Sequence, residues 1–93
     1  MKSIIQKEKE CYLCSSTLNL EKHHVCGGNG RRKWSDKYGL CVWLCPMHHR
    51  DAKQGVHGLN KDADLYLKQT AQKAFEKRHP HELWMQKFGK NYL

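Results

Sequence analysis

The chain has 93 residues, which is the size of one small domain and excludes enzymes that need a second catalytic lobe. Only 39% of the residues are hydrophobic, so we expect apolar burial alone to leave the fold marginally stable. The fold would then need an additional cross-link, or staple. Lys and Arg outnumber Asp and Glu by 17 to 9, and the resulting net charge of +8 predicts a polyanionic partner, with DNA or RNA the simplest candidate. A ribosomal protein or a membrane-surface binder would show the same excess of positive charge.

The first ten residues are mostly polar and charged, and we expect them to form a frayed tail rather than a basic arm on the nucleic acid. Their apolar pair, Ile4 and Ile5, is much shorter than the 7 to 15 apolar residues, roughly, of a secretory signal. No apolar run approaches the ~20 residues that span a bilayer. The expectation is a cytoplasmic protein with no membrane partner, whose five cysteines indicate metal binding rather than disulfides.

Two short apolar runs, at residues 20–25 and 40–44, predict a β-hairpin whose long loop covers residues 26–39. Pro46 is suited to the first position of a helix and Gly55 to its end. The sequence therefore predicts a short helix over residues 46–54.

The pattern changes at Lys61, where small and apolar residues begin to recur at helical spacing behind Asn60, a favourable N-cap. Pro80 ends this helix and opens a second one, which stops at Gly89. The expected architecture is one α+β domain over residues 1–93. It comprises a tail (1–10), a metal-bearing core (11–58) and a helical buttress (60–93).

Two short motifs predict a structural zinc site. Cys11 and Cys14 form a CxxC knuckle, and Cys45 and His48 repeat that spacing with His as the fourth ligand. Two knuckles held apart by a hairpin form a treble-clef-like arrangement, and the bound ion would supply the missing staple. Cys41 is less suitable than His48 as the fourth ligand, because an extended chain would hold Cys41 and Cys45 about 13 Å apart. The alternative to zinc is a set of buried free thiols with an incidental histidine.

Two histidine doublets, His23-His24 and His48-His49, exceed what one zinc ion needs. Adjacent side chains on a helix diverge by about 100°, so if His48 faces the zinc, His49 can serve a second ion. Strand alternation sends His23 and His24 to opposite faces. The two side chains can still serve one site if the doublet lies where the strand opens into the Gly-rich loop. There, one ring could bind a metal ion while its neighbour faces a scissile group.

Between Cys11 and about His57, these motifs resemble the HNH endonucleases, also called ββα-metal or His-Me finger nucleases. The closing FGKNYL is similar to small phage- and prophage-encoded members of that family. The resemblance implies a zinc-stapled ββα-metal core with C-terminal helices, acting as a metal-dependent DNA endonuclease that hydrolyses phosphodiester bonds. Possible partners in that setting are phage or recombination proteins.

The resemblance also implies roles for four histidines. His24 matches the general base, and His23 and His49 match ligands of the catalytic ion. His57 becomes a third ligand if the chain after Gly55 folds back. The family's middle Asn, which constrains the loop carrying the base, falls at residues 38–40, where no Asn occurs.

Phosphodiester hydrolysis needs a base, a divalent ion and a cation for the phosphate oxygens, and the residue types present fit that chemistry. Imidazole ligands suit Mn²⁺, Ni²⁺ or Zn²⁺ better than Mg²⁺, so the catalytic ion stays open. Arg31, Arg32 or Lys33 could clamp phosphate, or each could be a solvated loop charge. Trp34 could stack on a base or pack in the core.

We therefore expect an endonuclease of low sequence specificity, because phosphate contacts carry little sequence information. One active site in a monomer would nick DNA, whereas a dimer could cut both strands. The alternatives are a non-catalytic, zinc-dependent nucleic-acid-binding module and an adaptor in a phage recombination or packaging complex.

Overall fold

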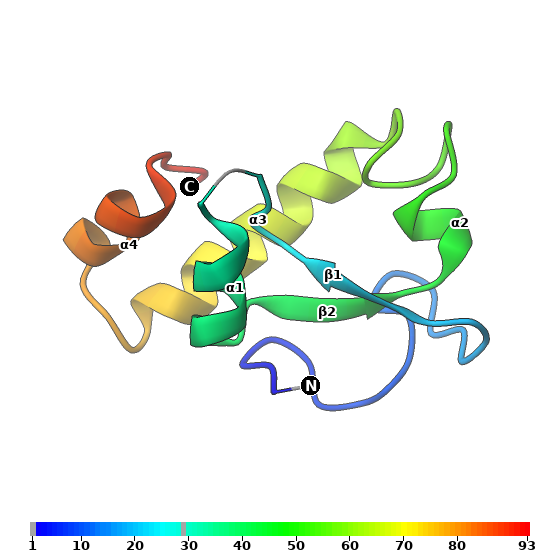
Figure 1. Cartoon of the computed structure of the whole chain (residues 1–93), viewed down its shortest axis with the longest axis horizontal. Helices are drawn as coiled ribbons and strands as arrows, with labels where there is room; N and C mark the ends of the chain where they lie inside the picture. Colours follow the sequence, from blue (N-terminus) through cyan, green and yellow to red (C-terminus); the bar gives the residue numbers. More distant parts are fainter. Residues whose placement is uncertain (1, 29) are drawn as a thin grey trace.

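The computed structural model describes residues 2–28 and 30–93 and shows a small α+β protein, as predicted (Figure 1). Its elements follow in the order β1 (Glu21–His24), α1 (Arg32–Tyr38), β2 (Cys41–Leu44), α2 (Pro46–His49), α3 (Lys61–Glu76) and α4 (His81–Phe88). Met1 of the predicted tail and Asn29 of the predicted loop lie outside the described residues.

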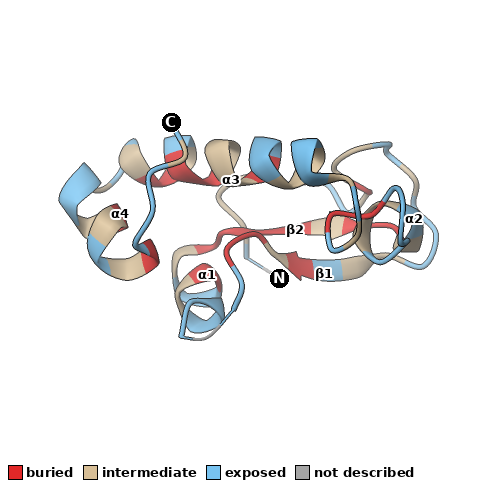
Figure 2. Cartoon of the chain, turned by 90° about the horizontal axis from the view of Figure 1, so that it is seen from above, coloured by how far each residue is buried: buried red, intermediate tan, exposed pale blue. Residues whose placement is uncertain are grey.

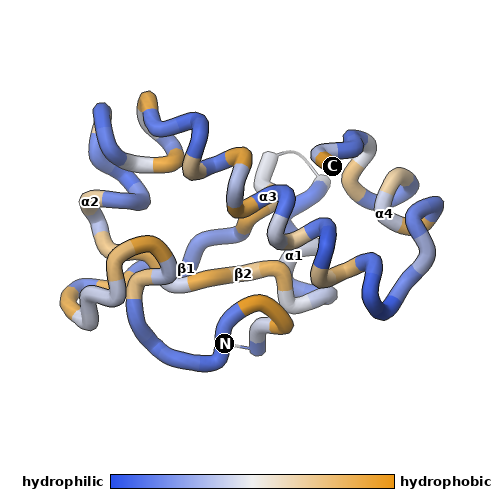
Figure 3. The backbone as a smooth tube through the Cα atoms, turned by 180° about the vertical axis from the view of Figure 1, so that it is seen from behind, coloured by the Kyte–Doolittle hydropathy of each residue, from blue (hydrophilic) through white to orange (hydrophobic). Residues whose placement is uncertain are grey.

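The predicted hairpin is confirmed: β1 and β2 form a two-stranded antiparallel sheet. His23 pairs with Val42 and His24 with Cys41. The tube in Figure 3 is apolar along β2 and polar along β1. In keeping with that difference, β2 is almost entirely buried, whereas His23 is the one buried residue of β1.

The connection between the strands is not the open loop that the sequence predicts, because residues 32–38 form α1. Its first turn has neither a capping side chain at Arg31 nor an acidic residue, so local signals are weak. A contact with the preceding loop and a glycine C-cap hold it instead. The buried Ser35 hydroxyl donates to the Cys26 carbonyl oxygen at 2.7 Å, and Gly39 ends the helix in the left-handed conformation at φ 70°.

The N-terminal segment is not the frayed tail that its composition predicts. The Ser3 hydroxyl donates to the carbonyl oxygen of Cys41 at 2.7 Å, and the Trp43 N–H donates to Gln6 Oε1 at 2.8 Å. The segment therefore covers the edge of β2 that β1 leaves open. These side chains satisfy backbone groups that a bare sheet edge would expose.

The helix predicted over residues 46–54 is shorter, because α2 ends at His49. Pro46 does occupy its first turn, as predicted. Beyond it the chain turns: the Asp51 carboxylate accepts the N–H groups of Lys53 and Gln54 at 3.0 and 2.9 Å. A short polar side chain that captures nearby N–H groups favours a turn over a continuing helix.

The two predicted C-terminal helices are confirmed as α3 and α4. The Asn60 side chain accepts from the Ala63 N–H at 3.2 Å and caps α3, while Pro80 and Gly89 flank α4. Figure 2 shows α3 lying across the hairpin, with its buried stretches turned toward β2. Across the described residues, no helix combines the length and apolar character that crossing a bilayer requires.

The core joins the hairpin to these two helices. Its largest buried side chains include Trp84, Phe75 and Phe88, whose rings lie 4.3 to 5.9 Å apart between centroids. The Trp84 Nε1–H donates to the Lys90 carbonyl oxygen at 2.8 Å, so this large aromatic is buried without losing its hydrogen bond. The core also includes Cys11 and Cys45, which connects it directly to the candidate metal site.

Candidate metal centres and the adjoining cleft

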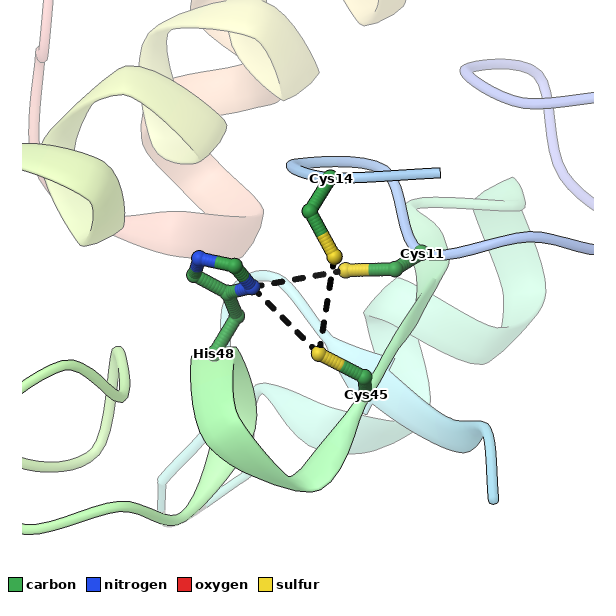
Figure 4. A group of neighbouring side chains, drawn as sticks. All are labelled: Cys11, Cys14, Cys45 and His48. Carbon is green, nitrogen blue, oxygen red and sulfur yellow. Dashed lines mark hydrogen bonds between the residues drawn. The ribbon is translucent and has the colours of Figure 1, made fainter. Parts of the chain in front are cut away.

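Three cysteines and one histidine converge where the chain before β1 meets the start of α2 (Figure 4). One ligand atom from each lies within 4.8 Å of the others, and the four residues are Cys11, Cys14, Cys45 and His48. We call them the cysteine cluster. They are the residues whose spacing predicts the structural zinc site.

The distances within the cysteine cluster suit one tetrahedral ion. A tetrahedron with Zn–S bonds of ~2.3 Å has edges of ~3.8 Å between sulfur atoms. Cys14 Sγ lies 3.7 Å from Cys45 Sγ, and His48 Nδ1 lies 3.3 Å from Cys45 Sγ and 3.8 Å from Cys11 Sγ. Bonded sulfur atoms would be ~2.05 Å apart, so the cysteines are free thiols rather than a disulfide.

Backbone contacts fix the first knuckle against the second. The Tyr12 N–H donates to the Trp43 carbonyl oxygen at 2.9 Å, just before Cys45 in the chain. The knuckle closes when the Cys11 N–H donates to the Ser16 carbonyl oxygen at 2.8 Å. Burial would raise the pKa of the Cys11 thiol, but hydrogen bonds from the surrounding backbone lower it on balance, which favours the metal-binding thiolate.

Cys41, the alternative fourth ligand, lies elsewhere. Its sulfur contacts the Ser35 carbonyl oxygen and Asp36 Oδ1, each at 3.8 Å. Burial raises the pKa of Cys41 to about 11, so its thiol stays protonated at neutral pH. The structure therefore groups His48, and not Cys41, with Cys11, Cys14 and Cys45.

A second cluster, the trihistidine cluster, consists of His23, His49 and His57. One ring nitrogen of each lies within 4.8 Å of the others, and the Nε2 atoms of His49 and His57 are 3.1 Å apart. His23 Nε2 is buried and has no hydrogen-bond partner among the described residues. Because an unpartnered buried nitrogen is costly, a bound ion would account for it.

Glu21 orients one member of the trihistidine cluster. Its carboxylate lies 2.8 Å from His49 Nδ1, and it also pairs with Arg50. An ionised carboxylate only accepts hydrogen bonds, so neutral His49 carries its proton on Nδ1 and keeps a lone pair on Nε2. This carboxylate–histidine arrangement is the usual support behind a metal-binding imidazole.

His57 joins the cluster because the chain folds back after α2. The N–H groups of Val56 and His57 donate to the carbonyl oxygens of His48 and His49 at 2.8 and 3.2 Å. A β-carbon on Gly55 would lie 2.7 Å from the backbone of the preceding turn, so only glycine fits there. The chain thus folds back after Gly55, which is the condition on which the resemblance makes His57 a third ligand.

The trihistidine cluster favours neutral rings. Burial, reinforced by the charge that His49 and His57 can carry, lowers the pKa of His23 to about 3. Burial also lowers the pKa of His57. Neutral imidazole is the form that binds a metal ion.

His24 lies on the same cleft as the trihistidine cluster. This cleft has a volume of about 260 Å³. It is lined by Lys22, His23, His24, Gly27, Gly28, Arg32, His49 and His57. Both residues of the first doublet therefore line one cleft, although strand alternation sends their side chains to opposite sides of β1.

Asp36, on α1, orients the His24 ring through a contact with its Nε2 atom. Its Oδ1 atom lies 3.0 Å from His24 Nε2 and 2.7 Å from Lys22 Nζ. Hydrogen bonds from Lys22 and then from His24 lower the pKa of Asp36, so it is ionised at neutral pH. Neutral His24 therefore carries its proton on Nε2, which leaves the lone pair of Nδ1 free.

The three basic residues predicted to clamp phosphate occupy different places. Arg32 lines the cleft. Arg31 reaches the end of α4, where its Nη2 atom would lie 3.2 Å from a β-carbon on Gly89. Lys33 lies over the Trp34 ring, 4.9 Å from its centroid. Of the three, Arg32 is the one placed to touch a molecule in the cleft.

Glu21 and Asp36 do not emerge from the sequence as site residues. Glu21 is two positions before His23 on a strand, and this spacing could have indicated a shared face. Asp36 has no such signal, because it meets His24 only through the helix that local sequence does not predict.

No family model matches this chain, and no curated protein or solved structure matches it either.

Proposed function

We propose that the protein is a metal-dependent DNA endonuclease with the ββα-metal fold, in which β1, β2 and α2 form the ββα unit. The observation that carries the proposal is that His24, Arg32 and the trihistidine cluster line one cleft. Phosphodiester hydrolysis requires a base, a divalent ion and a cation within reach of the same phosphate.

His24 acts as the general base in this proposal. Asp36 accepts from its Nε2, so Nδ1 is the atom that takes a proton from the attacking water. The arrangement fixes both the tautomer and the direction of the ring. A base that is already oriented avoids the cost of ordering it during the reaction.

His23, His49 and His57 would hold the catalytic ion, with Glu21 behind His49. The ion, when bound, stabilises negative charge on the phosphoryl and leaving oxygens. Arg32 neutralises a non-bridging oxygen of the same phosphate. Three protein ligands leave coordination positions for water and substrate, as in catalytic metal sites.

Two further features support the fold assignment. The cysteine cluster could hold a structural zinc ion, which would cross-link the chain before β1 to the start of α2. Ser35 hydrogen-bonds both the N–H and the carbonyl oxygen of Cys26, at 3.3 and 2.7 Å. It constrains the loop after the base, which is the role that the resemblance gives to the missing Asn.

Incubation of supercoiled plasmid with the protein in Mn²⁺ or Mg²⁺ tests the proposal. We expect wild type and the control His81→Ala to convert plasmid to nicked circles. His24→Ala should be slower by at least about 100-fold, and excess EDTA should stop the reaction. His81 is a suitable control because it is an exposed histidine on α4 that contacts Glu76.

Equal conversion by wild type and His24→Ala would refute the assignment of the base. No conversion by wild type in any divalent ion, with DNA binding retained, would favour a non-catalytic zinc-dependent module. Circular dichroism and zinc content of each variant show whether a loss of cleavage reflects a loss of fold.

A further inference from the structure

Three lysines surround the indole ring of Trp34. Lys33 and Lys37, on α1, place their Nζ atoms 4.9 and 5.6 Å from the ring centroid, and Lys87, on α4, lies 4.1 Å from it. In the described part of the chain, none of these ammonium groups pairs with a carboxylate. We call the four residues the lysine ridge.

The lysine ridge is electrostatically unfavourable by itself. Each exposed cation–π contact is worth about 0.5–1 kcal/mol, but three like charges around one ring repel one another. Ordering long lysine side chains also costs conformational entropy. A polyanion that lies on the ridge would remove the repulsion, and its affinity would gain from the cations already held together.

The ridge adjoins the cleft through α1. Arg32, which lines the cleft, and Asp36, which holds His24, are one helical turn apart and share a face of α1. Lys33 and Lys37 each follow one residue later and so lie about 100° further round the helix. Figures 1 and 2 both show α1 between the hairpin and α4, which carries Lys87.

We propose that the lysine ridge binds the phosphate backbone of duplex DNA beside the bond cleaved in the cleft. This inference rests on the proposed function for its choice of nucleic acid. Single strands are usually held by open aromatic faces on which bases stack. Trp34 is half-buried and lies beneath lysines, so the ridge offers cations rather than a stacking surface.

Fluorescence anisotropy with a labelled 20-base-pair duplex, titrated over a series of NaCl concentrations, tests this inference. Every protein carries His24→Ala and retains zinc, so that binding is measured without cleavage. Lys33, Lys37 and Lys87 are changed together to Gln in one variant and to Arg in a second. In the charge-matched control, the exposed residues Lys7, Lys53 and Lys73 are changed to Gln.

We expect the Gln variant of the ridge to bind at least about tenfold more weakly, and its salt dependence to lose about 2 to 3 units of slope. The Arg variant should bind like the parent, and the charge-matched control should retain most of the slope. Equal losses in the ridge variant and the control would overturn the inference, because net charge alone would explain them. Tighter binding of the matching single strand would also overturn it.

The two proposals fail in distinguishable ways. If wild type never cleaves but the ridge variant alone loses duplex affinity, the ridge assignment stands and the nuclease proposal falls. If cleavage depends on His24 but the ridge variant binds like its control, the nuclease proposal stands and the ridge assignment falls.

Discussion

Neighbouring side chains of β1 serve different surroundings because a strand alternates its faces. Glu21 and His23 turn toward α2, where Glu21 meets His49 and His23 joins the trihistidine cluster. Lys22 and His24 turn toward α1, where both meet Asp36. The two histidines of the doublet therefore have different surroundings: Asp36 contacts the His24 ring, whereas His23 packs against His49 and His57. Both residues line the cleft.

Replacement of Asp36 tests how the proposed general base, His24, is positioned. Asp36→Ala removes the acceptor that fixes the His24 tautomer, so we expect kcat for plasmid nicking to fall by about 10- to 100-fold with little change in KM. Asp36→Asn, which keeps an acceptor oxygen, should restore part of kcat. Steady-state kinetics on a labelled duplex separates the two constants.

Lys22→Met is the matched control, because it removes the other contact to the same carboxylate oxygen and leaves His24 in place. We expect this variant to keep kcat and to raise KM, since Lys22 lines the cleft where DNA would lie. A fall of kcat in Lys22→Met as large as that in Asp36→Ala would contradict a positioning role for Asp36.

At the scale of elements, α3 and α4 are joined by polar contacts as well as by the aromatic core. The Glu76 carboxylate accepts from Gln72 Nε2 at 2.7 Å and lies 2.8 Å from His81 Nδ1. Gln72 is fully buried and also binds Asn91 and the Tyr92 N–H, each at 2.8 Å. One polar network thus links both helices to the C-terminal residues.

This network predicts a pH-dependent contribution from Glu76. Burial would raise the pKa of Glu76, but the hydrogen bonds from His81 and Gln72 lower it on balance. A carboxyl whose pKa is lowered by folding stabilises the protein above its unfolded pKa of about 4.3, and this stabilisation is lost as pH falls through the folded value. Glu76→Gln should therefore reduce the free energy of unfolding by up to about 1 kcal/mol at pH 7 and by less near pH 3.

Urea unfolding at both pH values measures this difference. The exposed Glu8, changed to Gln, serves as the control because its carboxylate has no partner among the described contacts. A destabilisation of Glu76→Gln that is the same at pH 3 and pH 7 would show that the charge is not the cause.

Local sequence signals account for some elements and not for others. The hairpin, α3 and α4 are predictable because apolar runs, the Asn60 cap and Gly89 act over a few residues. α1 is not, because its first turn lacks a capping side chain and an acidic residue, and its buried Ser35 bonds Cys26, which lies outside the helix. The residues of the cysteine cluster follow from ligand spacing, and those of the trihistidine cluster from the family resemblance. The contact between Asp36 and His24 exists only once α1 has docked.

At the scale of the whole molecule, the two clusters both take a histidine from the short helix α2. His48 and His49 are consecutive residues of α2, and each belongs to a different cluster. Val56 and His57 pair with these same two residues through the backbone. We therefore expect anything that loosens the cysteine cluster also to displace the trihistidine cluster.

Removal of the zinc ion proposed for the cysteine cluster should unfold the chain. A structural zinc site contributes roughly 10 kcal/mol or more in small domains, which is comparable with the whole stability of such a protein. Cys14→Ser should lower zinc content by one equivalent and abolish cooperative thermal unfolding. Because Cys14 is exposed, lost packing cannot explain such an effect.

Cys26→Ala provides the comparison, since Cys26 is a buried thiol outside the cysteine cluster. Burial raises its pKa to about 12, so it remains a neutral core residue, and we expect its loss to cost only about 1 kcal/mol. The melting of each variant is monitored by circular dichroism. A melting temperature of Cys14→Ser equal to that of wild type would disprove a structural role for the metal.

The register of β1 against β2 decides which of the two adjacent imidazoles, His23 or His24, faces Asp36. Sliding one strand by a single position would turn every side chain of β1 to the other face, so the ring now facing Asp36 would face His49 instead. The proposed metal ligand and the proposed base would exchange places without any change in composition. Insertions and deletions should consequently be tolerated in the glycine-rich connection after β1 but not within the strand itself.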